Sequence, residues 1–474
     1  MTRGILAAAG YVPHGRLDRA EIAAFVGTGG GKGTRSVAWY DEDTTTLGVE
    51  AARLARRARP ESAPSALYFS TVSPAYVDKT NATGVAAALR LDSDVLAADF
   101  GGAQRSAVGA LLAALASSST VLTVAADARG GLAGSGDEAA GGDAGAALLV
   151  GDEDHGPLLA AFLGSASITE EFTDRWRGPG DARSKLWEER FGETAYVPLG
   201  ERAWREALKK AELEAGDVDR VIVTGLHSRA VRVLGTKLGV KDKLADDLSS
   251  RLGNAGSAQP GLLLAAALEA ASPGEVVALV VLADGADVLL FRAGEAASRA
   301  PVRSVADQLR GGTTVPYGKF LSWRGGLAIE PPRRPEPSRM SASAALRNED
   351  WKYAFAGKRD PVSGDPQLPP LPSGGEAVPM SDVAGTIATF TVDRLAYSPS
   401  PPIVFAIVDF DGGGRYPVEI TDVPEKDLAA DVRVGTRVEM TFRRLSTADG
   451  IHNYFWKARP LRGVAPTAPT AQPA

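Results

Sequence analysis

Short apolar segments alternate with longer helix-like segments over residues 1–330, and this alternation constrains the fold more than any other feature. Continuous apolar runs such as 67–72 are typical of strands buried on both faces. Apolar residues with helical spacing recur in segments such as 45–59. The predicted strands are 4–9, 67–72, 120–126, 144–150, 220–224, 276–282 and 287–291, and the predicted helices are 45–59, 107–116, 202–215 and 258–271. Such alternation predicts α/β layers around mostly buried sheets.

The pattern changes near residue 331, which predicts a second type of domain. Residues 330–337 are rich in proline and predict a stiff linker. Residues 348–355 predict a short helix, and 361–376 a loop. Five strand-like segments then follow, at 385–392, 403–410, 415–420, 437–444 and 453–457. Short strands separated by turn residues are typical of an all-β, OB-type barrel.

The expected domain order follows from these changes of pattern. Two halves of similar length, 1–155 and 156–330, form the α/β part. Residues 331–380 form the linker and a ribbon-like region, and 381–462 form the barrel. The segment 463–474 is rich in Pro, Ala and Thr and predicts a disordered tail.

The chain has no cysteine, which narrows its chemistry. Disulfides, thiolate zinc sites and cysteine nucleophiles are all excluded. No other metal-ligand cluster stands out, so we expect no metal. A net charge of −6 argues against a nucleic-acid partner. No apolar run is long enough to span a bilayer and no signal peptide is evident, so we expect a cytoplasmic protein without a membrane partner.

Several short motifs in the first 330 residues occur in a distinctive order. They are Gly10-Tyr11-Val12-Pro13, Tyr40-Asp41-Glu42-Asp43-Thr44, 68–83, Asp127, 141–151, 173–177, Leu226-His227, Gly253-Asn254 and 320–325. Together they resemble the hydroxymethylglutaryl-CoA synthases, especially the archaeal-type branch, within the thiolase superfamily. The resemblance implies a five-layered αβαβα thiolase-like fold, coenzyme A as part of the substrate, and a homodimer or a heterodimer with a cysteine-bearing thiolase homologue.

The C-terminal part has a resemblance of its own. Residues 384–392 and 404–412 resemble the first two strands of zinc-ribbon-plus-OB proteins that accompany thiolases in acyl-CoA metabolism. Four cysteines normally hold the zinc of that ribbon. The corresponding stretch, 357–372, contains none, so we expect a degenerate ribbon without metal.

The resemblance places two of the family's reactive groups at positions where this chain lacks them. The family's nucleophilic cysteine corresponds to Gly102, and the nearest hydroxyl is that of Ser106, which also fits an ordinary helix serine. The catalytic glutamate corresponds to Thr71 or Val72, and neither can act as a base at neutral pH. Covalent hydroxymethylglutaryl-CoA synthesis by the usual route is therefore not expected.

The oxyanion pair of the family is retained by resemblance, as His227 and Asn254. In the family these side chains point at the thioester oxygen. The alternative is that His227 is a satisfied buried histidine and Asn254 a helix cap. The turn 283–287 departs from the glycine- and serine-rich turn of the family, which leaves the shape of the pocket open.

These features predict an acyl-CoA carbon–carbon lyase or acyltransferase of lipid metabolism that uses no cysteine nucleophile. Retro-aldol cleavage of a β-hydroxyacyl-CoA is one example, because it needs an enolate stabiliser and a base but no acyl-enzyme. Candidate bases are Tyr76, Asp99 and Tyr317, each of which also fits a structural role. Candidate contacts to the CoA phosphates are Arg175, Arg177, Arg229 and Lys319. The alternative is a non-catalytic scaffold that docks a separate thiolase through its OB domain.

Overall fold

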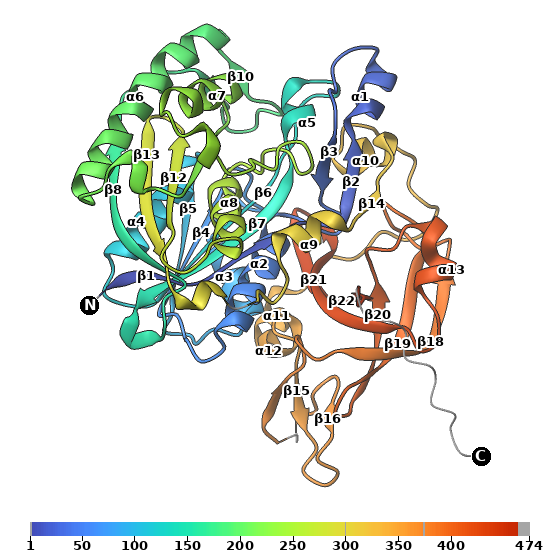
Figure 1. The fold of residues 1–474 in the computed structure, drawn as a ribbon. Coiled ribbons are helices and arrows are strands. Elements are labelled where there is room, and N and C mark those ends of the chain that lie inside the picture. Colours follow the sequence, from blue (N-terminus) through green and yellow to red (C-terminus); the bar gives the residue numbers. More distant parts are fainter. Residues whose placement is uncertain (1, 299, 373–374, 463–474) are drawn as a thin grey trace. The chain divides into compact units, whose positions relative to one another are not determined.

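The computed structural model describes residues 2–298, 300–372 and 375–462, and the chain forms two compact units (Figure 1). The first unit comprises Met1–Ala38, Asp43–Val85 and Leu91–Gly326. The second comprises Trp39–Glu42, Ala86–Arg90 and Leu327–Ala474. The second unit therefore draws on two short segments from the N-terminal third of the chain. The predicted disordered tail lies outside the described residues.

A mixed β-sheet forms the centre of the first unit. Its strands lie in the order β11 (Arg220–Gly225), β12 (Val276–Leu282), β13 (Ala286–Ala293), β8 (Ala160–Ile168), β1 (Arg3–Tyr11), β7 (Asp143–Asp152), β6 (Val121–Ala128), β4 (Ala66–Thr71) and β5 (Leu96–Gly101). Strands β1 and β8 pair only through Gly4 with Ala161 and Ile5 with Ala160. The sheet is thus two sheets that meet along one short seam, and every strand predicted from the sequence is present.

Helices cover both faces of each half-sheet. Helices α4 (Arg105–Ala116) and α8 (Ala258–Glu269) share one core with Leu279 of β12 and Leu148 of β7. The opposite face of β12 presents Val280 to a second core, which is formed with α6 (Glu189–Lys210) and α7 (Ser228–Lys237). Helix α2 (Thr44–Ala58) packs on β1, β6 and β7. The layers are therefore αβαβα, as the resemblance implied.

Helix α6 is the largest departure from the sequence-based prediction. It begins at Glu189 rather than 202 and contains Pro198. Gly192 and Pro198 weaken the helical pattern of this segment in the sequence. Tertiary packing compensates, because Tyr196, Val197 and Leu199 are buried in the core beneath the helix.

The second unit contains a closed five-stranded barrel, as predicted. Its strands are β18 (Gly385–Asp393), β19 (Ile403–Phe410), β20 (Arg415–Ile420), β22 (Ile451–Pro460) and β21 (Arg437–Ala448), in that order. The ribbon region forms a small sheet of β15 (Ala356–Arg359), β16 (Pro366–Gln367) and β17 (Ala377–Pro379). The predicted helix 348–355 is shorter, as α12 (Glu349–Lys352).

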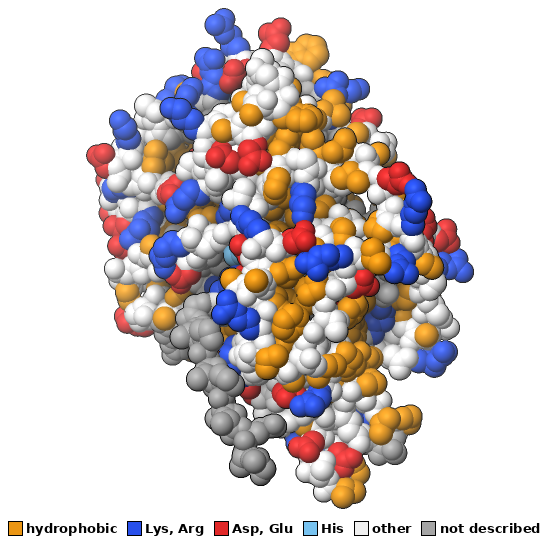
Figure 2. All heavy atoms as spheres, turned by 90° about the vertical axis from the view of Figure 1, so that its right-hand side faces the viewer, with side chains coloured by type: hydrophobic (Ala, Val, Ile, Leu, Met, Phe, Trp, Pro, Cys, Tyr) orange, Lys and Arg blue, Asp and Glu red, His pale blue; other side chains and the backbone are white. Residues whose placement is uncertain are grey.

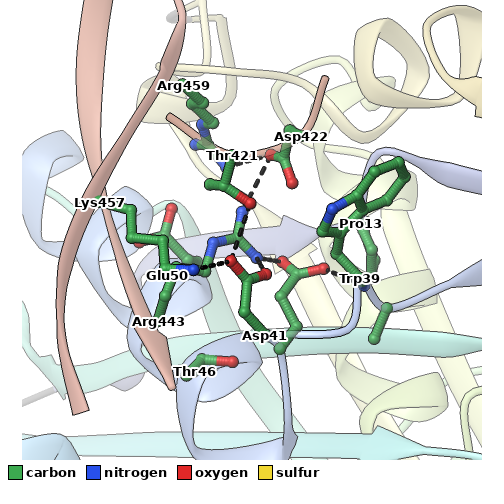
Figure 3. A network of polar contacts seen from close by, with 12 residues as sticks. Pro13, Trp39, Asp41, Thr46, Glu50, Thr421, Asp422, Arg443, Lys457 and Arg459 are labelled. Carbon is green, nitrogen blue, oxygen red and sulfur yellow. Dashed lines mark hydrogen bonds and ion pairs between the residues drawn. The ribbon is translucent and has the colours of Figure 1, made fainter. Parts of the chain in front are cut away.

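A network of buried ion pairs joins strands of this barrel to the segment Trp39–Glu42 (Figure 3). Arg443 of β21 forms ion pairs with Asp422, at 2.9 Å, and with Glu42. Lys457 of β22 pairs with Asp41 at 2.9 Å, and Thr421 donates a hydrogen bond to the same carboxylate at 2.8 Å. The segment Trp39–Glu42 thus supplies anions that neutralise buried cations of the barrel strands. Buried charges require such partners because desolvation penalises an unpaired ion.

The remaining elements are short. They are β2 (Gly15–Asp18), α1 (Arg19–Val26), β3 (Thr34–Val37), α3 (Ala82–Ala88), α5 (Gly136–Ala140), β9 (Arg175–Trp176), β10 (Lys185–Leu186), α9 (Val305–Arg310), β14 (Thr313–Thr314), α10 (Tyr317–Trp323), α11 (Ala342–Arg347) and α13 (Leu428–Asp431). In the described part of the chain, no helix combines the length and apolarity needed to cross a membrane. On the face shown in Figure 2, basic and acidic side chains are interspersed.

Candidate active site

The first unit contains a cleft of about 1180 Å³. Its wall is built from the segments that follow β4, β5 and β12, from the starts of α5 and α7, and from the β9–β10 hairpin region. The polar and aromatic lining residues include Ser73, Gln104, Arg129, Asp137, Asp174, Arg175, Trp176, Arg177, Asp181, Arg183, Trp187, Glu188, Glu189, Tyr196, His227 and Asp284. A cavity of this size, with both charged and aromatic walls, can hold a large polar ligand.

Gly102 lies on the cleft wall just before α4. Its φ angle is +104°, a conformation that favours glycine over residues with a side chain. A Cβ built there would meet nothing within 4 Å, so the space beside it is open. Ser106 is not among the residues that line the cleft, and its hydroxyl donates a hydrogen bond to the carbonyl of Gly101 at 2.7 Å, as an ordinary helix serine does. This part of the cleft therefore offers open space at the position where the resemblance predicts the family's thiol.

The position of the family's glutamate is also used differently. The Thr71 hydroxyl donates a hydrogen bond to Asp127 at 2.8 Å. The backbone N–H of Val72 donates to the same carboxylate oxygen at 2.9 Å. Asp127 is fully buried and also accepts from the N–H of Ser257 at 2.7 Å. These contacts anchor the end of β4 and provide no proton acceptor in the cleft.

His227 lies on the cleft wall and caps α7. Its Nδ1 accepts a hydrogen bond from the backbone N–H of Ala230 at 3.1 Å, and its Nε2 lies 2.9 Å from the carbonyl oxygen of Glu189. These partners place the proton on Nε2. A Cβ at Gly192 would overlap the imidazole, so α6 approaches the ring closely there. Both ring nitrogens are engaged in structural contacts.

Asn254 is not among the residues that line the cleft. Its Nδ2 donates to the carbonyl of Gly225 at 3.0 Å, and its Oδ1 accepts from the N–H of Gly256 at 2.9 Å. Its backbone bridges to Gly141. Asn254 therefore ties the loop before α8 to the end of β11, two residues before His227, and no direct contact joins the two side chains of the predicted oxyanion pair.

The three predicted bases lie outside the cleft lining. Asp99 accepts hydrogen bonds from the backbone N–H groups of Asn81 and Ala82, both at 2.7 Å, at the start of α3. Tyr317 is buried and its hydroxyl donates to Glu138 at 2.7 Å. Tyr76 is tied through its backbone to the Asn81 side chain. Each of these residues takes part in contacts that hold local structure, and the structure does not bring the three together.

Two of the four predicted phosphate contacts lie on the cleft wall. Arg175 forms a bidentate pair with Asp137, at 2.9 and 2.8 Å. Arg177 is exposed and donates one hydrogen bond to the carbonyl of Val72. Arg229 pairs with Glu193 and is not a lining residue, and Lys319 is an exposed residue of α10 outside the lining. The cations that face the cleft are therefore Arg175, Arg177 and two that the sequence reasoning missed, Arg129 and Arg183.

An acidic cluster was also missed by the sequence reasoning. The Tyr196 hydroxyl donates to Asp174 at 3.1 Å and accepts from the backbone N–H of Asp284 at 3.2 Å. Burial, followed by the nearby charge of Asp174, raises the pKa of Tyr196. The same two causes raise the pKa of the Asp284 carboxyl. The departure of 283–287 from the family's turn was the sequence signal that pointed here.

Comparison with known proteins finds a family model for the barrel and relatives that cover about two-thirds of the chain. Residues 377–443 match the family model described as ChsH2, C-terminal OB-fold domain. The hydroxymethylglutaryl-CoA synthase of Methanopyrus kandleri is 30% identical over 347 residues, which cover 68% of this chain and 97% of that protein. The enzyme of the same name from Pyrococcus furiosus is 29% identical, covering 60% of this chain and 83% of that protein.

Solved structures show the same fold. The structure of MvaS in complex with 3-hydroxy-3-methylglutaryl coenzyme A matches with a TM-score of 0.60 at 22% identity, covering 71% of this chain and 94% of that chain. The 3-oxoacyl-(acyl carrier protein) synthase III of Pseudomonas aeruginosa matches with a TM-score of 0.54 at 19% identity, covering 62% and 99%. The layers and these matches define a thiolase-like protein. Within that class, the chain belongs to the hydroxymethylglutaryl-CoA synthase family and carries a C-terminal OB-fold domain, which confirms the resemblance.

Proposed function

We propose that the cleft binds a CoA thioester and that the protein makes or breaks a carbon–carbon bond next to the thioester carbonyl without forming an acyl-enzyme. Retro-aldol cleavage of a β-hydroxyacyl-CoA is the simplest such reaction. The observation that carries the proposal is the open space at Gly102 on the cleft wall, the position that the resemblance gives to the family's nucleophile. The family relationship supports a CoA thioester as the ligand.

The cleft offers the electrostatic conditions that this reaction needs. Gly102, Ala103 and Gln104 bring the start of α4 to the cleft wall. The partial positive charge of a helix N-terminus favours the negative charge that develops on a thioester oxygen as an enolate forms. Arg129, Arg177 and Arg183 supply cations for the phosphates of CoA. Trp176 and Trp187 add apolar surface beside them.

The second candidate is a non-catalytic scaffold that docks a separate thiolase through its OB-fold domain. It is favoured by the absence of both reactive groups from the positions that the resemblance gives them, Gly102 and either Thr71 or Val72, and by the match of 377–443 to a ChsH2 OB-fold domain. A heterodimer with a cysteine-bearing homologue fits this candidate, whereas a homodimer fits the enzyme. Turnover by the protein alone separates the two.

The test incubates the purified full chain with a panel of β-hydroxyacyl- and β-ketoacyl-CoA thioesters and follows CoA products by mass spectrometry. Gly136→Phe is the variant designed to block the cleft. Gly136 lines the cleft, and a Cβ there meets nothing within 4 Å, so the position has room for a side chain. Gly109→Phe on exposed α4 surface is the matched control. We expect a shorter acyl-CoA with wild type and with Gly109→Phe, and none with Gly136→Phe. Absence of any product with wild type would favour the scaffold.

A further inference from the structure

One carboxylate on the cleft wall is held in place through its backbone alone. Asp284 lies in the turn between β12 and β13, with a φ angle of +47°. Its backbone N–H donates to the Tyr196 hydroxyl at 3.2 Å, and its carbonyl accepts from Arg105 at 2.8 Å. Arg105 is itself fixed by a bidentate pair with Asp287, at 2.8 and 3.1 Å. Among the described residues, no donor contacts the Asp284 carboxylate, which is open to the cleft.

The surroundings of Asp284 favour its protonated form. Surrounding protein desolvates the carboxyl, and the negative charges of Asp174 and Glu171 act in the same direction. The Arg105 guanidinium opposes them, and the net effect raises the pKa of Asp284 above its ordinary value. A carboxylate that is harder to ionise is a stronger proton acceptor, and its open place on the cleft wall leaves it accessible to a ligand.

Four other polar side chains on the cleft wall already have protein partners. Asp174 is buried and accepts a hydrogen bond from the Tyr196 hydroxyl, so these two groups are paired with each other. Asp137 is paired with Arg175. Both nitrogens of His227 contact backbone groups. Asp284 thus combines an unengaged carboxylate, a fixed backbone and a place on the cleft wall.

We propose that Asp284 is the catalytic acid–base of the cleft, an assignment that rests on the function proposed above. In the cleavage direction, its carboxylate takes the proton of the β-hydroxyl group. The oxygen–hydrogen electron pair forms the new carbonyl, the Cα–Cβ bond breaks, and its electron pair forms the thioester enolate. The neutral Asp284 then returns the proton to Cα, which yields the shorter acyl-CoA and a free carbonyl compound. No co-reactant is needed.

The test uses two activities, so that the assignment and the reaction can fail separately. Wild type, Asp284→Asn and Asp242→Asn are incubated with β-hydroxyacyl-CoA to follow cleavage, and with butyryl-CoA in D₂O to follow deuterium uptake at Cα by mass spectrometry. Asn is close in shape and tolerates a positive φ. Asp242 is exposed and lies outside the cleft lining, so its variant controls for the charge change. Affinity for free CoA is measured by calorimetry for all three.

We expect Asp284→Asn to lose about 100-fold or more in both cleavage and exchange, as removal of a general acid–base does, with CoA affinity unchanged. If the wild type exchanges deuterium but does not cleave, and Asp284→Asn loses the exchange, the assignment would be supported and the lyase reaction overturned. Activity of Asp284→Asn within a few-fold of an active wild type would overturn the assignment and leave the proposed function standing. A wild type that binds CoA but neither exchanges nor cleaves would overturn both.

Discussion

The imidazole Nε2 of His227 lies 2.9 Å from the backbone carbonyl oxygen of Glu189, the first residue of α6. The second ring nitrogen accepts the N–H of Ala230 in the first turn of α7. The histidine therefore joins the starts of two helices at the edge of the cleft. The family resemblance assigns His227 to an oxyanion hole, whereas these contacts are those of a helix cap. The two roles predict different effects of substitution on stability and turnover.

Substitution of His227 by Asn separates a cap from an oxyanion donor. Asn caps helices well, so His227→Asn keeps an acceptor for the Ala230 N–H, whereas His227→Ala loses it. We expect His227→Ala to lower the free energy of unfolding by about 1 kcal/mol and His227→Asn by less. Turnover of both is expected to stay within about tenfold of wild type, well above the loss that removal of an oxyanion donor causes. A folded His227→Asn with turnover reduced by about 100-fold or more would establish the oxyanion role instead.

Arg177 is expected to contribute to CoA affinity. It is exposed on the cleft wall and uses one donor on the Val72 carbonyl, which leaves its other N–H groups for a phosphate. Arg177→Ala should weaken CoA binding about tenfold, equivalent to about 1.4 kcal/mol, as measured by calorimetry at low salt. Arg229→Ala is the matched control, because Arg229 pairs with Glu193 outside the cleft lining. Equal effects of the two variants would contradict the assignment of this wall to the phosphates.

The buried ion pairs of the barrel should dominate the stability of the second unit. Asp422→Asn removes the charge that faces Arg443 at 2.9 Å and Arg459 at 3.8 Å, both of them buried. The variant leaves Arg443 with Glu42 and Arg459 with Glu439 but removes the anion that the two buried cations share, so we expect a loss of about 3 kcal/mol in urea unfolding. Asp409→Asn is the control, since its pair with Arg415 is exposed and should be worth below about 1 kcal/mol. A loss no larger than that of the control would mean that the network carries little stability.

Glu269 should make the stability of the first unit depend on pH. Burial raises the pKa of its carboxyl to about 7, although the N–H of Val305 donates to it at 2.9 Å. The folded protein keeps this proton up to about pH 7, whereas the unfolded chain releases it near pH 4.5, the ordinary value for a glutamate. The folded state therefore binds more protons in this window, and the free energy of unfolding falls as the pH rises from 4.5 to 7.

Glu269→Gln removes that dependence while keeping an acceptor for the Val305 N–H. We expect the variant to be more stable than wild type at pH 8, by about 2 kcal/mol, and nearly equal to it at pH 5. Urea unfolding at the two pH values measures the difference. A stability difference that does not change with pH would show that Glu269 is ionised in the folded protein throughout this range.

The sequence predicts the architecture well because each strand or helix can be recognised from the apolar pattern of its own segment. Strand β12 was placed at its observed bounds, since a continuous apolar run is typical of a strand covered on both faces. The start of α6 could not be predicted, because Gly192 and Pro198 weaken its pattern and only tertiary packing shows that Tyr196 is buried. The contribution of Asp41 to the barrel was equally hidden, because it depends on a contact with a residue 416 positions away, Lys457.

Only those residues of the candidate site that belong to a recognisable motif could be predicted from the sequence. Arg175 and Arg177 were found through a family motif, and both lie on the cleft wall. Asp284 was not, because its importance comes from the absence of a partner for its carboxylate and from the nearby Asp174, 110 positions earlier in the chain. The departure of 283–287 from the family's turn marked this segment in the sequence, but the proximity of Asp284 to Asp174 has no local signature. Conversely, Asp99 and Tyr317 have suitable chemistry in the sequence, and only the structure shows that their polar groups serve a helix start and a buried carboxylate.

We propose that the protein makes or breaks the carbon–carbon bond without forming an acyl-enzyme. Mass spectrometry of the intact protein, sampled during turnover of a β-hydroxyacyl-CoA and after rapid acid quenching, tests it most directly. We predict that a shorter acyl-CoA accumulates while the mass of the protein stays that of the unmodified chain at every time point. A transient increase equal to the mass of the acyl group, mapped by digestion to Ser106 or to any other side chain of the cleft, would contradict the account.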